Sequence, residues 1–351
     1  MNTRRLLTTL VTGLSMFSPF SLILSSVIWA QVARAGDKPR PSYSSVQPNV
    51  SITPRVRPGK EIGGPEADRE ATIRVDTTLV LIPVGVTDPI GRIVTGLERH
   101  HFKVTEDKVE QELVSVSSED VALSVGIVFD TSGSMGDKLK KAGQAVTQFM
   151  KLANPEDEFF LVQFNDSPEL TVPFTRNVGE LQSRLMFLQS KGRTALLDAV
   201  YLAIHEMKRN ARNPRKAILI VSDGGDNSSR YSQPEVQRLV READVQIYAI
   251  GIFEPFRGHG SFVEELNGPG LLGEIAEQSG GRHFIIDNVA ELPDIATKIG
   301  LELRNQYLLS YTPKNAVRDG KYRKVEVRLV KLQGLLTLRP TFRRGYYAPP
   351  H

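Results

Sequence analysis

Residues 123–135 read LSVGIVFDTSGSM, and this stretch decides the fold. Its first seven residues are mostly apolar, which is typical of a strand buried on both faces of a sheet. Asp130 ends the apolar run, and Ser132 and Ser134 follow at alternate positions. Residues 138–152 then show helical periodicity. A buried strand is therefore expected to deliver a carboxylate and two hydroxyls to the loop before a helix.

The alternation of strand and helix continues to about residue 303. Further strands are predicted over residues 158–164, 217–221 and 245–250, and further helices over 195–208, 234–243, 271–278 and 291–303. Helices between strands imply a mainly parallel sheet that is covered on both faces. The predicted fold class is therefore α/β, with a doubly wound, Rossmann-like sheet.

Two segments with strand and turn patterns flank this region, at residues 71–118 and 304–351. Neither segment alone closes a core, and strands left unpaired at an edge invite aggregation. We therefore expect the two segments to pair in one flanking β-sandwich-like unit.

The amino-terminal region has a different composition. Arg4 and Arg5 precede an apolar stretch over residues 6–30, and Ala33 and Ala35 provide small residues for cleavage. This pattern predicts a secretory signal, with an uncleaved membrane anchor as the alternative. The expected division of the chain is a signal or anchor at 1–35, a Pro/Ser-rich disordered linker at 36–70, a β segment at 71–118, the α/β domain at 119–303 and a second β segment at 304–351.

The composition excludes several classes of site. The 351 residues include no cysteine, so disulfides, thiolate metal sites and a cysteine nucleophile are excluded. The formal net charge of +4 includes Arg4, Arg5 and Arg34 of the expected signal, so the mature chain would be nearly balanced. This charge indicates no nucleic-acid partner. The predicted signal implies that the protein is secreted, periplasmic or at the cell envelope.

Oxygen-bearing side chains gather where the predicted strands end. In open α/β sheets, ligands bind at the carboxyl ends of strands, where Asp130, Ser132 and Ser134 would lie. Thr194 follows the Gly192 turn, and Asp223 follows the apolar run 218–221. Such oxygen ligands suit a hard cation, which we expect to be Mg²⁺, with Mn²⁺ or Ca²⁺ as alternatives.

Simpler roles compete for some of these residues. Asp130, Ser132 and Ser134 could instead cap the following helix. Asp226 fits either a solvated turn or the mouth of the metal site, and the turn is favoured. Asp198 is expected to be structural, because it falls in the first turn of its helix.

No other catalytic pattern stands out. The histidines lack zinc-ligand spacing, no Gly-x-Ser-x-Gly surrounds Ser134, and no phosphate-binding glycine loop is present. Basic residues near the carboxyl terminus could attract an anionic polymer, although charges alternating on exposed strand faces explain them equally well.

The site residues, taken together, resemble the von Willebrand factor A domain with its metal-ion-dependent adhesion site. That site combines Asp-x-Ser-x-Ser with a distant Thr and a distant Asp. The resemblance covers roughly residues 120–300, and it implies that Asp130, Ser132, Ser134, Thr194 and Asp223 hold the metal directly or through water. It also implies that filling the site can be linked to movement of the last helix.

The wider chain is similar to secreted von Willebrand factor A-related proteins of acidobacterial type. The shared features are residues 91–97 (GRIVTGL), 102–107 (FKVTED), 306–313 (QYLLSYTP) and 345–347 (GYY). That family often has Glu-Asp-Gly where this chain has Glu106, Asp107 and Lys108, so a different turn is expected there.

These observations favour an exported, non-enzymatic binding module. Its metal would recognise an acidic group on an unidentified protein or surface component, because Mg²⁺ can accept a partner's carboxylate oxygen. The alternatives are a structural or assembly subunit of a cell-envelope complex and a metal-dependent hydrolase. Contact with a membrane is expected only through an uncleaved anchor.

Overall fold

The computed structural model describes residues 79–118, 120–253, 263–330 and 337–350, without the side chains of 263–269. The expected signal, the linker and the beginning of the expected β segment at 71–118 lie outside the described residues. Within these ranges, no helix is both long and apolar enough to cross a membrane.

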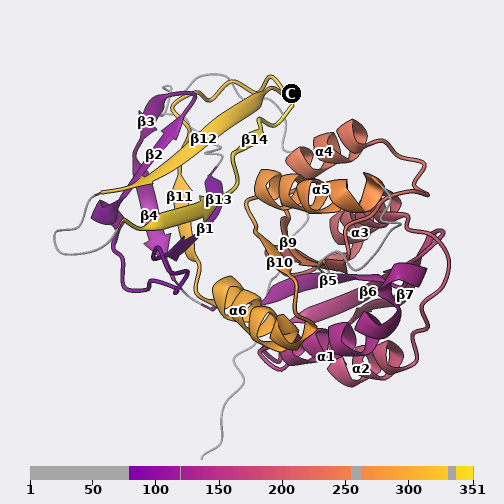
Figure 1. Cartoon of the computed structure of the whole chain (residues 1–351). Helices are drawn as coiled ribbons and strands as arrows, with labels where there is room; N and C mark the ends of the chain where they lie inside the picture. Colours follow the sequence, from indigo (N-terminus) through magenta and orange to yellow (C-terminus); the bar gives the residue numbers. More distant parts are fainter. Residues whose placement is uncertain (1–78, 119, 254–262, 331–336, 351) are drawn as a thin grey trace, which may run out of the picture. The chain divides into compact units, whose positions relative to one another are not determined.

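A six-stranded sheet forms the centre of the α/β domain (Figure 1). Its strand order is β10-β9-β8-β5-β6-β7, and only β7 runs antiparallel to its neighbour. The strands are β5 (Leu123–Asp130), β6 (Glu158–Phe164), β7 (Pro168–Thr175), β8 (Arg215–Ser222), β9 (Gln246–Ile252) and β10 (His283–Ile286). Every residue of β5 is buried, as the apolar run predicted.

Helices cover both faces of this sheet. They are α1 (Leu139–Met150), α2 (Val178–Met186), α3 (Leu196–Asn210), α4 (Gln233–Glu242), α5 (Val263–Ser279) and α6 (Leu292–Arg304). Val125 and Ile127 of β5 face a core completed by α1, α2 and α6. Val128 faces the opposite core, which α3, α4 and α5 complete. The predicted α/β fold class with a mainly parallel sheet is therefore confirmed.

Three elements of the domain were not anticipated. β7 has one buried residue, Val172, and its other residues are half-buried or exposed, so it lacks the continuous apolar run of a central strand. α2 is only nine residues long, and β10 only four. The helix expected at 271–278 begins earlier, at Val263, because Pro269 and nearby glycines conceal its start in the sequence.

The flanking β unit contains two antiparallel sheets, ordered β13-β1-β11-β4 and β14-β12-β2-β3. Its elements are β1 (Val80–Thr87), the 3₁₀ turn η1 (Arg99–His101), β2 (Phe102–Glu106), β3 (Val109–Gln111), β4 (Leu113–Ser117), β11 (Tyr307–Tyr311), β12 (Tyr322–Leu329), β13 (Arg339–Phe342) and β14 (Gly345–Tyr347). β1 pairs with β11, and β2 pairs with β12. The expected pairing of the segments before and after the α/β domain is thus confirmed.

The turn between β2 and β3 has a left-handed backbone. Asp107 and Lys108 have φ angles of 47° and 70°. Consecutive positive φ angles are typical of tight hairpin turns, which favour glycine at the second residue. Lys108 therefore occupies a conformation that a glycine would adopt more easily.

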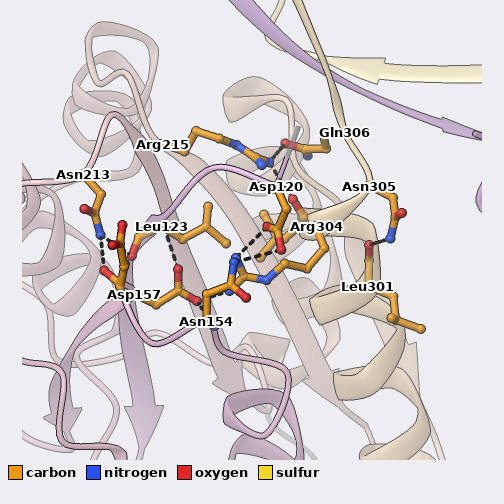
Figure 2. A network of polar contacts seen from close by, with 12 residues as sticks. Asp120, Leu123, Asn154, Asp157, Asn213, Arg215, Leu301, Arg304, Asn305 and Gln306 are labelled. Carbon is orange, nitrogen blue, oxygen red and sulfur yellow. Dashed lines mark hydrogen bonds and ion pairs between the residues drawn. The ribbon is translucent and has the colours of Figure 1, made fainter. Parts of the chain in front are cut away.

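A polar network lies where the chain passes between the two β segments and the α/β domain (Figure 2). Arg304, at the end of α6, pairs with Asp120 at 3.0 Å and with the buried Asp157. Arg215 donates to the Leu303 carbonyl at 2.5 Å and to Gln306 Oε1 at 2.6 Å. The network therefore holds the segment that leads into β5, through Asp120, and the segment that follows α6, through Gln306.

Candidate metal centre

The two acidic residues of the expected site follow neighbouring strands. Asp130 is the last residue of β5, and Asp223 comes directly after β8. β5 and β8 are parallel, and Phe129 is paired with Val221, which places both carboxylates at the same edge of the sheet. The central strands therefore bring together acids that lie far apart in the sequence, as predicted.

Asp130 is fully buried, and its carboxylate accepts two hydrogen bonds. The Ser132 backbone N–H donates to Oδ1 at 2.8 Å, and the Ser222 hydroxyl donates to Oδ2 at 2.6 Å. Burial and the Asp223 charge raise the pKa of Asp130 to about 7. Two ionised carboxylates in this place therefore require a compensating positive charge.

The two serines lie on the loop after β5. Ser132 is buried and precedes the 3₁₀ helix η2 (Gly133–Lys138), whereas Ser134 is exposed within it. Their hydroxyl oxygens are 3.1 Å apart. Ser132 occupies the cap position of η2, but its side chain makes no capping hydrogen bond there. Helix capping therefore does not account for the Ser132 hydroxyl.

Backbone contacts join the Thr194 loop to the serine loop. Gly133 N–H donates to the Gly192 carbonyl at 3.0 Å, and Gly192 has a φ of 77°. A side chain at Gly192 would strike Asp166, with its Cβ only 2.4 Å from Oδ2. Thr194 itself is buried. Glycine is thus required at the turn that precedes Thr194.

The loop after Asp223 is tied to the same region. Thr194 N–H donates to Asn227 Oδ1 at 3.0 Å, and Asn227 N–H donates back to the Thr194 carbonyl at 2.9 Å. The loops that carry Ser132, Thr194 and Asp223 are therefore held together by direct contacts between protein groups.

Asp226 and Asp198, for which the sequence favoured structural roles, both accept hydrogen bonds from neighbouring protein groups. Asp226 Oδ1 accepts hydrogen bonds from the Ser229 hydroxyl at 2.5 Å and from the Leu197 N–H at 3.3 Å. Asp198 Oδ1 accepts bonds from the Arg230 and Tyr231 N–H groups at 2.8 and 3.0 Å. Both carboxylates therefore fasten the loop after Asp223 to the start of α3.

Sequence reasoning missed two contributors. One is Ser222, which binds Asp130 and carries no signal beyond its place at the end of a strand. The other is Lys138, whose Nζ lies 3.7 Å from Asp223 Oδ2. Lys138 is one of three lysines within residues 138–141, so the sequence does not distinguish it from its neighbours.

The donor set fits a hard divalent cation. In the described part of the chain, no three His, Asp or Glu side chains cluster as a metal site, so a cation here would rely on two carboxylates and several hydroxyls. Such oxygen donors suit Mg²⁺, which commonly takes one or two carboxylates and keeps several waters. The mutual proximity of Asp130 and Asp223 also favours a doubly positive ion between their loops.

Comparison with known proteins identifies the domain that carries this site. Residues 125–225 match the von Willebrand factor type A domain family. The central domain is a von Willebrand factor type A domain. Domains of this family commonly bind a divalent metal, in keeping with the donor set described above.

The relatives extend beyond the von Willebrand factor type A domain. Inter-alpha-trypsin inhibitor heavy chain H4 of Bos taurus is 26% identical over 220 residues, which are 58% of this chain and 23% of that protein. The matching protein of Mus musculus is 25% identical and covers 65% of this chain and 24% of that protein. The chain thus spans less than a quarter of the length of these relatives.

Similar solved structures also contain von Willebrand factor domains. A von Willebrand factor type A protein from Catenulispora acidiphila is 12% identical, with a TM-score of 0.46, and covers 78% of this chain and 74% of that one. The von Willebrand domain of a type V pili tip protein from Porphyromonas gingivalis is 15% identical, with a TM-score of 0.42, and covers 52% of this chain and 97% of that one.

Proposed function

We propose that this protein is an exported, metal-dependent binding module. Asp130, Ser132, Ser134, Thr194 and Asp223 would hold a divalent cation, Mg²⁺ in the first instance, directly or through water. The cation would supply a Lewis-acidic position that accepts an acidic group from a partner protein or surface component. The observation that supports this most strongly is the buried Asp130 beside Asp223.

The acidic pair is costly without such a ligand. Burying a carboxylate is unfavourable unless it is paired, and a second carboxylate nearby adds repulsion. The Ser132 N–H and the Ser222 hydroxyl offset part of this cost for Asp130. Lys138 Nζ, 3.7 Å from Asp223 Oδ2, offsets a further part, and a divalent cation would offset the rest.

The surroundings of the acidic pair suit an acidic partner. Ser134 is exposed beside the buried Ser132, so the site has an accessible side. Arg193 and Arg230 are exposed on the two adjoining loops, and the Arg193 side chain donates to the Asn227 carbonyl. Complementary charge at the rim of an interface speeds association and disfavours wrong partners.

Binding is better supported than hydrolysis. A hydrolase would need a general base that is not itself a metal ligand. The neighbouring carboxylates Asp166, Asp198 and Asp226 each accept hydrogen bonds from the backbone, at Arg193, Arg230 and Leu197 respectively. These bonds hold the three carboxylates in structural roles, which favours binding over hydrolysis.

Metal titration tests the proposal directly. We would titrate Mg²⁺, Mn²⁺ and Ca²⁺ by calorimetry into the metal-stripped native chain and into an Asp130→Ala, Asp223→Ala double variant. Asp137→Ala is the matched control, because Asp137 is an exposed acid on the same loop. We expect one saturable site in the native chain and the control, and none in the double variant, with circular dichroism showing all three to be folded. Equal behaviour of native chain and double variant would refute the metal site.

Partner recognition and export need separate measurements. Capture of a partner by the native chain in Mg²⁺, with loss in chelator and in the double variant, would support metal-dependent recognition. Cell fractionation would test export, since the protein should be found outside the cytoplasm.

A structural subunit of an envelope complex is the second candidate. Its support is the pair of exposed apolar side chains on edge strands of the β unit, Val109 on β3 and Val114 on β4, which are 51% and 55% exposed. Edge strands offer unpaired backbone groups to another chain. A partner that stays bound to the folded double variant, but is lost from a Val114→Lys variant, would favour this function.

A further inference from the structure

Lys138 lies where the metal loop becomes a helix. It is the last residue of η2 and the residue directly before α1. A positive charge at the amino end of a helix is unfavourable, because the helix dipole is positive there. Something else in the structure must therefore compensate for the Lys138 ammonium.

Asp223 is that compensating group. The distance from Lys138 Nζ to Asp223 Oδ2 is 3.7 Å, and the two side chains are only 13% and 12% exposed. Charges that are largely removed from solvent interact more strongly than exposed ones and are less screened by salt. Lys140 and Lys141, on the following turn, are both exposed. Lys138 is thus the lysine of this run that faces the acidic pair.

We propose that Lys138 is the internal counter-ion of the site, that it neutralises Asp223 when no metal is bound, and that it lowers the affinity of the site for divalent cations. The inference rests on the proposed metal-binding function. It adds a residue outside the five expected ligands that sets how much free metal is needed to fill the site.

The ion pair and the metal are antagonists for electrostatic reasons. A divalent cation held by Asp223, directly or through water, would stand within a few ångströms of the ammonium if Lys138 stayed in place. Like charges at that separation repel strongly in a partly enclosed site. At 3.7 Å the pair lacks hydrogen-bonding contact, and lysine has a flexible stem, so the ammonium is free to withdraw. Metal binding therefore includes the cost of breaking this pair.

Metal affinity tests the inference in the full-length chain. Lys138→Met removes the charge and keeps much of the apolar stem, whereas Lys138→Arg keeps the charge. Lys141→Met is the matched control, because it removes an exposed lysine three residues away. The Kd for Mg²⁺ and for Mn²⁺ would be measured by calorimetry at one ionic strength, with circular dichroism to confirm folding. Lys138→Gln replaces Lys138→Met should the latter not fold.

We expect the neutral variant at position 138 to bind metal on the order of tenfold more tightly than the native chain. Lys141→Met should stay within about twofold of native, because the charge it removes is exposed and screened. Lys138→Arg should also remain near native. A neutral variant that binds no more tightly than Lys141→Met would overturn the inference while leaving the metal site itself established.

Thermal unfolding of the metal-free proteins separates this inference from the function on which it rests. In a cycle of Lys138→Met, Asp223→Asn and the double variant, we expect the two single changes of Tm to be non-additive, because the two groups interact. Additive changes would show that no pair exists and would overturn the inference. Absence of metal binding by the native chain would overturn both the inference and the proposed function, whatever the cycle shows.

Discussion

At the scale of single residues, Lys108 holds a backbone conformation that suits glycine better. Its φ of 70° lies in the left-handed region, which disfavours residues with a side chain. We expect Lys108→Gly to raise the free energy of unfolding by about 0.5–1 kcal/mol, which urea denaturation would measure. Lys103→Gly, in the extended strand β2, is the control and should lower it. A loss of stability in Lys108→Gly would contradict the account of this turn.

Single residues also show which parts of the candidate site could be predicted from the sequence. Asp130 and Asp223 could be predicted, because each ends an apolar run and the ends of parallel strands meet. The partnership of Lys138 with Asp223 could not, since it depends on the direction of a side chain at a helix start. The assignment of Asp130, Ser132, Ser134, Thr194 and Asp223 as ligands stays a prediction, and the metal titration tests it for the two acids.

At the scale of elements, the carboxyl end of α6 depends on one arginine. Arg304 pairs with the buried Asp157 and with Asp120, and Arg304→Met would leave Asp157 without a cation (Figure 2). Removing one partner of a buried pair typically costs about 3–5 kcal/mol of stability. We expect a loss toward about 3 kcal/mol, because Asp157 keeps the Leu123 and Asn154 N–H donors.

Urea denaturation would measure this loss, and Arg328→Met provides the control. Arg328 pairs with Glu326 on an exposed strand face, with side chains 72% and 47% exposed. Such surface pairs contribute little, about 0–1 kcal/mol. Similar small losses in both variants would show that the Arg304 pairs do not fasten α6.

Some strands could be predicted from the sequence more readily than others. β5, β8 and β9 are buried on both faces, so their apolar runs were unmistakable. β7 is the antiparallel edge strand and has only one buried residue. Its hydrophobic pattern therefore could not be distinguished from that of a loop. The sequence pattern thus reports burial, and elements with little burial escape it.

At the scale of the whole molecule, the β unit requires both of its sequence segments. Val80, Ile82 and Val84 of β1 are buried in a core shared with Leu309 and Tyr311 of β11. A chain that ends at residue 304 loses β11 to β14 and leaves this apolar face uncovered. We expect it to aggregate, as measured by light scattering.

A chain of residues 119–306 is the control for that truncation. It keeps the two cores that cover both faces of the central sheet. We expect it to remain monomeric and to retain any metal binding of the full-length chain. Aggregation of this chain would instead show that the α/β domain depends on the β unit for its folding.

The neighbouring strands β4 and β11 have a mechanical consequence. They pair antiparallel, with Leu308 opposite Ser117, and the α/β domain is inserted between them in the sequence. A partner that pulls on the loops at the carboxyl ends of β5 and β8 would therefore transmit tension to the β unit through two covalent connections in parallel. Each connection bears part of the load, and Arg304 and Arg215 brace both where they meet the α/β domain. Such load sharing suits a tether that must hold while its partner moves.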